Sequence, residues 1–248
     1  KADGFDLVDD FSDLFGMNAA GTDAKMRNTK ESILEAQFTS GAGNWCTWMF
    51  GRDLVNWNNN FTWAKWVTPS RDLISAFKQE GDEVRFKESI VYYDCNWSNY
   101  YPSDNYPFMY KCRSANSSII KYRYADVLLL KAEALIMQDT PDLEGAADII
   151  DKVRDRAKLG ALPTSVRSNK NAMLNALLKE RRLELAFEGQ RWFDLVRLDK
   201  VEEVMNAVYA KDSGRKAQIY TFDKNSYRLP IPQSVIDAND KIHQNPGY

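Results

Sequence analysis

The sequence predicts a mainly α-helical fold, because the chain changes character near residue 119. Beyond that point, apolar residues recur at the three-and-four spacing of a buried helical stripe. Residues 1–118 are instead rich in Gly, Asn, Ser, Trp and Tyr, with short apolar runs, which indicates loops with a few short strands and helices. We therefore expect a loop-rich region with aromatic clusters over residues 1–118 and a helical-repeat scaffold with a wrapping tail over residues 119–248.

The first two expected helices form a hairpin. Residues 122–138 form the first helix, and Thr140 then caps a second helix that has Pro141 at its first position and ends at Gly160. Two antiparallel helices joined by about three residues make a helical hairpin. The residues expected to face inward are Ala125, Leu128, Leu129, Ala132, Leu135 and Ile136 in the first helix and Ala146, Ile150, Val153 and Ala157 in the second.

A second hairpin is expected to follow the first. Residues 169–188 form its first helix, with Gly189 as the C-cap. Asp199 and Glu202 have the spacing of a capping box, which predicts a last helix through Ala207. The self-similarity between the two hairpins is weak, but their order is that of a helical repeat.

Two regular elements are expected in the loop-rich region. Residues 32–38 alternate as a strand does. Residues 70–79 begin with Ser70 as N-cap and place Leu73, Ile74 and Phe77 on one helical face. At the other end of the chain, the prolines of residues 227–248 exclude one long helix, so we expect this tail to wrap back over the surface.

Composition narrows the possible functions. The 248 residues are 44% hydrophobic and 27% charged with a net charge of −2, which lacks the basic surplus that nucleic-acid binding needs. No apolar run approaches the roughly 20 residues that span a bilayer. Cys46, Cys95 and Cys112 form no Cys-x-x-Cys pair. The sequence allows one disulfide bridge, between Cys95 and Cys112, without deciding whether it forms.

The sequence predicts no cofactor and no metal site. His243 is the only histidine, which excludes a His-rich metal site and argues against a His-dependent catalytic triad. Asp94, Asp104 and Asn105 offer oxygen ligands for calcium, but their spacing matches no calcium loop.

Several motifs together resemble the SusD/RagB family. They are YRYADVLLLKAEAL (122–135), IIDKVRDRAKL (149–159), LLKERRLELAFEGQRWFDLVRL (177–198) and the terminal LPIPQSVI and QNPGY. The resemblance covers roughly residues 69–248. It implies a SusD-like superhelix of tetratricopeptide-like helical hairpins with long irregular loops, of which this chain is the C-terminal part.

The resemblance also implies a function. Family members are non-catalytic lipoproteins on the surface of the Gram-negative outer membrane, where they capture glycans for a SusC-like TonB-dependent transporter, and some capture peptides. The chain opens at Lys1 without a signal segment or lipidation site. We therefore expect a preceding part that carries the lipid anchor and further helices.

The stretch GNWCTWMFGRDLVNWNNNFTWAKW, residues 43–66, holds five of the seven tryptophans. Indole rings can stack on the C–H faces of a sugar while neighbouring amides bind its hydroxyls. Each tryptophan alone is more often a packing residue, but for the cluster as a whole we favour ligand contact. The candidate ligand-binding residues here are Trp45, Trp48, Trp57, Trp63, Trp66 and Asn58.

A second aromatic stretch covers residues 92–110, where tyrosines alternate with Asn and Asp. This composition suits a hydrated, adaptable binding surface. The alternative, a strand and loop packed inside the protein, is favoured equally. Tyr100 and Tyr101 are its candidate ligand-binding residues.

The most charged motif, KERRLELAFEGQRW, invites a catalytic interpretation of Glu184 and Glu188. On a helix, Arg181 lies one turn from Glu184, so ion pairs explain the pattern without catalysis. Arg191 and Trp192 are expected to pack the following turn. Three alternatives to glycan capture remain: a peptide-binding RagB-like member, a glycoside hydrolase with two carboxylates in one cleft, and a plain helical-repeat interaction module.

Overall fold

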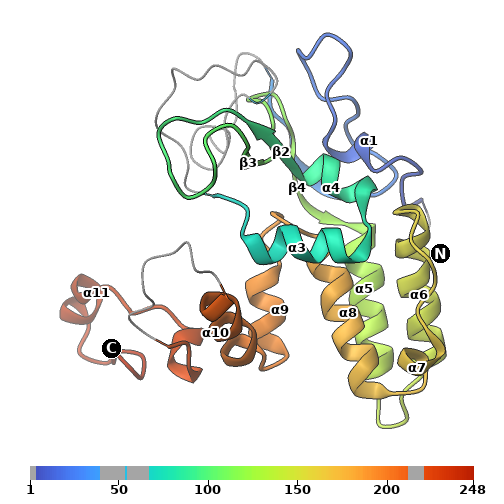
Figure 1. Ribbon diagram of the computed structural model, residues 1–248. Helices are drawn as coiled ribbons and strands as arrows, with labels where there is room; N and C mark the ends of the chain where they lie inside the picture. The colour runs from blue at the N-terminus through green and yellow to red at the C-terminus, as the bar shows by residue number, and fades with distance from the viewer. Residues whose placement is uncertain (1–3, 40–53, 55–66, 212–220) are drawn as a thin grey trace. The chain divides into compact units, whose positions relative to one another are not determined.

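The structure is a computed structural model that describes residues 4–39, 54, 67–211 and 221–248 (Figure 1). The chain divides into two compact units, Lys1–Gly189 and Gln190–Tyr248. The fold is mainly α-helical with a few short strands, as the sequence predicts.

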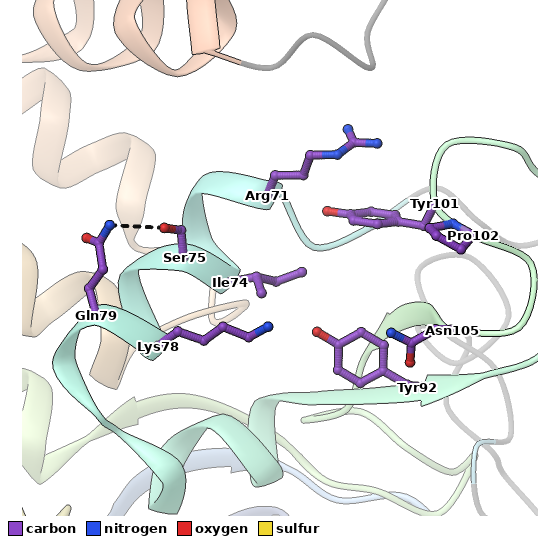
Figure 2. A pocket seen from close by; sticks show the side chains of 9 residues that line it. All are labelled: Arg71, Ile74, Ser75, Lys78, Gln79, Tyr92, Tyr101, Pro102 and Asn105. Carbon is purple, nitrogen blue, oxygen red and sulfur yellow. Dashed lines mark hydrogen bonds between the residues drawn. The ribbon is translucent and has the colours of Figure 1, made fainter.

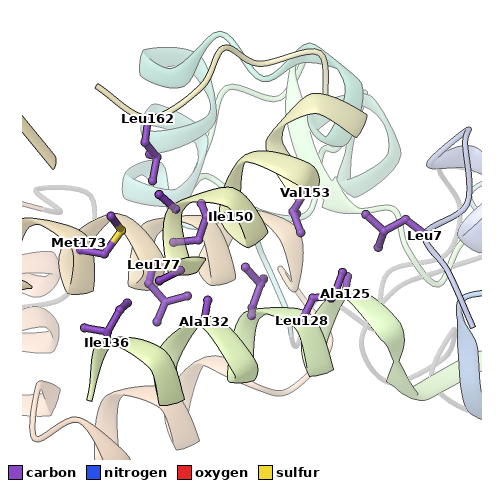
Figure 3. Close-up of a cluster of buried hydrophobic side chains, with 13 residues drawn as sticks. Leu7, Ala125, Leu128, Ala132, Ile136, Ile150, Val153, Leu162, Met173 and Leu177 are labelled. Atoms are coloured by element: carbon purple, nitrogen blue, oxygen red, sulfur yellow. The ribbon is translucent and has the colours of Figure 1, made fainter. Parts of the chain in front are cut away.

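The helical core of the first unit lies between helices α5 (Tyr124–Ile136), α6 (Leu143–Arg156) and α8 (Lys170–Glu184), with the short α7 (Thr164–Arg167) beside them. Figure 1 shows α5, α6 and α8 side by side. Fully buried alanines let these helices approach closely. Figure 3 shows the core, which includes Ala125, Leu129, Ala132, Ile136, Ala146, Ile150, Val153, Met173 and Leu177.

The α5–α6 hairpin is confirmed, but its connection differs from the prediction. The connection spans residues 137–142, and Asp142, not Thr140, is the N-cap of α6. The Asp142 Oδ1 accepts from the Gly145 amide at 2.9 Å. A Cβ at Gly145 would lie 2.9 Å from the Asp142 carboxyl carbon, so a glycine leaves room for this cap. Thr140 was the wrong choice because an acidic side chain two residues later competes for the same role.

Helix α8 begins as predicted and ends early. Asn169 caps it by accepting from the Ala172 amide at 2.9 Å. The helix ends at Glu184 rather than Glu188, because residues 185–189 form turns in which Phe187 (φ 65°) and Gly189 (φ 82°) adopt left-handed backbone conformations.

The rest of the first unit combines short helices with two antiparallel strand pairs. Strand β1 (Ser32–Ala36) pairs with β4 (Ile119–Arg123), which confirms the strand expected at 32–38. Helices α3 (Arg71–Glu80) and α4 (Glu83–Ser89) lead into β2 (Ile90–Tyr93), which pairs with β3 (Tyr106–Met109). The short α1 (Ser12–Phe15) lies near the N-terminus.

Helix α3 confirms the expected segment and its cap. The Ser70 Oγ accepts from the Leu73 amide at 3.1 Å, and Leu73, Ile74 and Phe77 are buried. Gly81 ends the helix with φ 70°, a backbone conformation that favours glycine.

A buried cluster of charges, which we call the charge network, joins the loop-rich part of the first unit to α8. Glu184 is fully buried and pairs with Arg85, Arg123 and Arg156. Burial alone would raise the pKa of Glu184, but these three cations hold it well below its ordinary value. Glu188 pairs with Arg123 and with Lys111, whose pKa burial lowers to about 8. Both glutamates are therefore structural.

The expected partner of Glu184 was wrong, although structural pairing itself is confirmed. Arg181 pairs with Asp126 of α5 at 2.8 Å and not with Glu184. The cations around Glu184 come from α4, β4 and α6, so tertiary packing replaces the local i,i+3 pair. Glu31 completes the charge network by accepting from Arg123 at 2.7 Å and from Arg156 at 2.6 Å.

The second unit contains α9 (Arg191–Arg197), α10 (Val201–Lys211), the 3-10 helix η1 (Lys224–Tyr227) and α11 (Gln233–Ala238). The expected last helix is present as α10, but a further helix, α9, lies between α8 and α10 in the chain, so the two helices of the expected second hairpin are not consecutive. The unpredicted α9 precedes α10 and contains both Arg191 and Trp192. The Trp192 ring packs against Phe222 at 6.3 Å.

Asp199 does not have the backbone of an N-cap. Its φ is 52°, whereas an N-cap residue is extended, and its Oδ1 accepts from the Tyr227 hydroxyl at 2.6 Å. The tail is not one long helix, as expected. In the tail, Gln244 binds both backbone groups of Ile231, accepting from its amide at 2.7 Å and donating to its carbonyl at 2.9 Å.

Two further expectations concern cysteines and membranes. No disulfide joins Cys95 to Cys112. Among the described residues, none of the helices combines the length and the apolar character that crossing a bilayer requires.

Candidate ligand-binding site

The structure describes only some of the predicted ligand-binding residues. Trp45, Trp48, Trp57, Trp63, Trp66 and Asn58 lie outside the described residues. Tyr100 and Tyr101 lie in the described loop between β2 and β3.

Tyr100 and Tyr101 form an aromatic pair with Arg71 against it. Their ring centroids are 4.9 Å apart at 88°, an edge-to-face geometry that aromatic rings prefer. The Arg71 guanidinium lies 4.2 Å from the Tyr100 ring centroid and 4.6 Å from that of Tyr101, and it donates to the Tyr100 carbonyl. The Tyr101 hydroxyl donates to the Pro69 carbonyl at 2.7 Å. These contacts fix the loop to the start of α3.

A pocket of about 460 Å³ lies between α3, β2 and this loop. Figure 2 shows the Tyr101 ring nearly edge-on, with Arg71 on one side and Ile74 and Asn105 on the other. The Tyr92 ring forms the opposite wall. Ring and apolar surface in the pocket come from Ile74, Tyr92, Tyr101 and Pro102, and polar groups come from Arg71, Ser75, Lys78, Gln79 and Asn105.

The aromatic walls of the pocket are held by the core. Tyr92 and Tyr101 both pack against the buried cluster of Leu73, Ile74, Phe77, Ile90, Leu183 and Ala186. Tyr92 lies on β2, where it pairs in register with Pro107 of β3. Partial burial raises the pKa of Tyr92, so this ring stays neutral at physiological pH. Both rings thus rest on the buried cluster, Tyr92 from a strand and Tyr101 from the loop that follows it.

The chemistry of this pocket favours a ligand with both apolar and polar faces. Two phenol rings offer flat apolar contact, while the side chains of Gln79 and Asn105 offer amide donors and acceptors. Among the residues that the structure describes, no Asp or Glu lines the pocket, and neither Glu184 nor Glu188 reaches it.

The sequence contains a signal for half of this pocket, although those residues are not among the predicted ligand-binding residues. Arg71, Ser75, Lys78 and Gln79 recur at helical spacing on the polar face of α3, opposite its predicted apolar face. Tyr92 belonged to the second aromatic stretch but was not chosen. Only the tertiary contact between α3 and the 94–105 loop shows that these residues share one pocket. Of the two predicted tyrosines, Tyr101 lines the pocket, whereas Tyr100 contacts the Arg71 guanidinium and is not among the lining residues.

Comparison with known proteins identifies the family. The sequence signature of the SusD family matches residues 107–248, more than half of the chain. This chain belongs to the SusD family. The match contains all the motifs that carried the resemblance. The resemblance expected from residue 69 onward extends further toward the N-terminus than the matched region.

Relatives of this SusD family chain agree with the assignment. It is 35% identical over 143 residues to SusD-like protein P2 of Formosa agariphila, covering 55% of this chain and 27% of P2. It is 24% identical to a laminarin-binding SusD-like protein, with a TM-score of 0.67 and 99% and 54% of the two chains covered. A SusD homologue from Bacteroides thetaiotaomicron gives 20% identity, a TM-score of 0.72 and coverage of 100% and 57%.

At these identities, the solved structures establish the fold and not the ligand. The chain spans about half the length of the solved SusD-like chains and matches about a quarter of P2.

Proposed function

We propose that this SusD family chain takes part in non-catalytic capture of oligo- or polysaccharides at the cell surface, for import through a SusC-like TonB-dependent transporter. The observation that carries the proposal is the pocket beside α3, where Tyr92 and Tyr101 are anchored on the core and surrounded by amide and hydroxyl groups. A pyranose presents axial C–H groups to a ring and hydroxyls at its equator, which is the chemistry that these walls complement.

The remaining site residues belong to the same proposal. We propose that the glycan is also bound by Trp45, Trp48, Trp57, Trp63, Trp66 and Asn58, and that residues 119–248 serve as scaffold. Each stacked ring contributes about 0.5–1.5 kcal/mol beyond the burial of its surface, so affinity at a single site is modest. Several sites along one polymer raise the overall affinity.

The non-catalytic part of the proposal is supported by the placement of the carboxylates. A glycosidase presents two carboxylates to one cleft at roughly 5–9.5 Å. In the described part of the chain, no carboxylate lines the pocket beside α3, and the two glutamates of the charged motif, Glu184 and Glu188, form buried ion pairs.

Location and partner follow from family membership. SusD family proteins are associated with the outer-membrane surface, and we propose that a lipid-anchor segment preceding these residues holds the chain there. We further propose that a SusC-like barrel receives the captured glycan. Co-purification of the full-length protein with the SusC-like barrel tests this partnership. Recovery of the two proteins as separate species contradicts it.

Titration separates glycan capture from its alternatives. The chain is titrated calorimetrically with a panel of oligosaccharides and with peptide pools, and each mixture is analysed for released products. We expect heat from at least one glycan, none from peptides and no cleavage products. Binding of peptides alone supports a peptide-binding member, product release supports a hydrolase, and a silent panel supports a plain interaction module.

A further inference from the structure

The pocket beside α3 is cationic. Two of its lining residues, Arg71 and Lys78, carry a positive charge at neutral pH, and none of the described residues that line it carries a negative charge. Asp104 lies in the turn that contributes Pro102 and Asn105, but it does not line the pocket. The local charge of the pocket therefore differs in sign from the net charge of −2 of the whole chain.

The acidic residues of α3 do not neutralise this pocket. The Asp72 Oδ2 accepts from Arg182 at 2.6 Å. Glu80 accepts from Arg154 at 2.7 Å and also from Lys179. Both carboxylates thus pair with cations of α6 and α8, and neither lines the pocket.

Lys78 is the cation best placed to meet a ligand. It is exposed on α3, and within the described residues it forms no ion pair. Figure 2 shows its amine directed across the pocket toward the Tyr92 hydroxyl, with Asn105 beyond. Arg71 differs, because its guanidinium is stacked on Tyr100 and Tyr101 and serves to hold the loop.

From this arrangement we infer that the pocket takes an acidic sugar unit, whose carboxylate or sulfate group meets Lys78 while its ring lies against the tyrosines. This inference rests on the proposed glycan-binding function and names the class of glycan. A charge-assisted hydrogen bond is roughly twice as strong as a neutral one, so the anionic group fixes the orientation of the sugar. Gln79 and Asn105 then bind hydroxyls on either side.

Matched polymers test the inference and separate the two anionic groups. The 248-residue chain is titrated at low and high salt with polygalacturonate against neutral galactan, and with dextran sulfate against dextran. Preference for the first member of either pair, weakened by salt, supports the inference and shows whether the group is carboxylate or sulfate. Equal or tighter binding of the neutral polymers overturns it but leaves glycan capture intact. Silence toward every glycan overturns both.

Variants locate the effect at Lys78. We expect Lys78→Gln to weaken binding of the acidic glycan about two- to fivefold, and Lys78→Glu to weaken it further. Lys87→Gln is the matched control, because Lys87 is an exposed lysine on the neighbouring α4 that does not line the pocket and the net charge changes equally. Circular dichroism checks that all variants fold. Equal losses in Lys78→Gln and Lys87→Gln overturn the inference, since long-range charge then explains the affinity.

Discussion

Arg123 holds Glu188 at two points, with Nε 2.7 Å from Oε2 and Nη2 2.9 Å from Oε1. The remaining nitrogen, Nη1, lies 2.5 Å from Glu184 and 2.7 Å from Glu31. Because Arg123 is the last residue of β4 and Glu188 lies in the turns after α8, this contact joins the β1–β4 sheet to the helical core. A planar guanidinium suits such a two-point contact, whereas a lysine does not.

Removing Arg123 should destabilise the first unit strongly. We expect Arg123→Met to lower the free energy of unfolding by about 3–5 kcal/mol, because Glu184 and Glu188 are left buried with too few cations. Arg123→Lys should recover only part of this loss. Urea denaturation measures both.

An exposed ion pair is the control for Arg123. Lys152 pairs with Asp6 at 2.7 Å with both side chains more than 40% exposed. Lys152→Met should therefore cost less than about 1 kcal/mol. Similar losses at Arg123 and Lys152 would show that the charge network does not hold the fold together.

Lys111 should make stability depend on pH in the alkaline range. Burial lowers its pKa from 10.5 to about 8, although the charges of Glu188 and Glu184 oppose the shift. Between about pH 8 and 10.5 the unfolded chain keeps a proton at this residue that the folded chain has released, so its contribution raises the free energy of unfolding as pH rises. Below pH 8 both states carry the proton, and the contribution is constant.

The variant Lys111→Met isolates this contribution. We expect the difference in unfolding free energy between the native chain and Lys111→Met to grow in favour of the native chain across that window, by on the order of 3 kcal/mol. Urea denaturation at a series of pH values measures it. A pH-independent difference would mean that Lys111 titrates at its ordinary pKa.

The N-cap of α3 should matter for both stability and ligand binding. Ser70→Ala removes the side chain that accepts from the Leu73 amide and should cost about 1 kcal/mol of stability. Since Arg71, Ser75 and Lys78 extend from the same helix, glycan affinity should fall as well. Ser70→Asp keeps a capping oxygen and should restore both properties. Denaturation midpoints and calorimetric titration measure these two properties. Full glycan affinity in Ser70→Ala would show that the cap does not contribute to the binding site.

The helices were predictable because their signals are local. The Ser70 cap and the apolar stripe of α5 depend only on nearby residues, and they appear where expected. The charge network was not predictable in its pairings, because Glu184 meets arginines from three distant elements. The pocket was half predictable: the aromatic loop marked Tyr101, but its partner α3 could be placed only by tertiary packing.

Tyr92 should contribute directly to glycan affinity. We expect Tyr92→Ala to weaken binding by about 0.5–1.5 kcal/mol, the contribution of one stacked ring. Tyr122→Ala is the control, since that tyrosine is 55% exposed on β4 and does not line the pocket. Calorimetric titration compares the two, with unfolding midpoints to confirm the fold. Equal affinities in both variants would remove Tyr92 from the site.

Hydroxyl-radical footprinting with and without a bound oligosaccharide tests the central claim most directly, because it reports where the ligand lies on the whole chain. The proposed site predicts that saturating glycan lowers the modification rates of Tyr92 and Tyr101, while the rate at Tyr122 is unchanged. Undiminished modification of Tyr92 and Tyr101 at saturation would place the ligand elsewhere and contradict the pocket beside α3 as the glycan site.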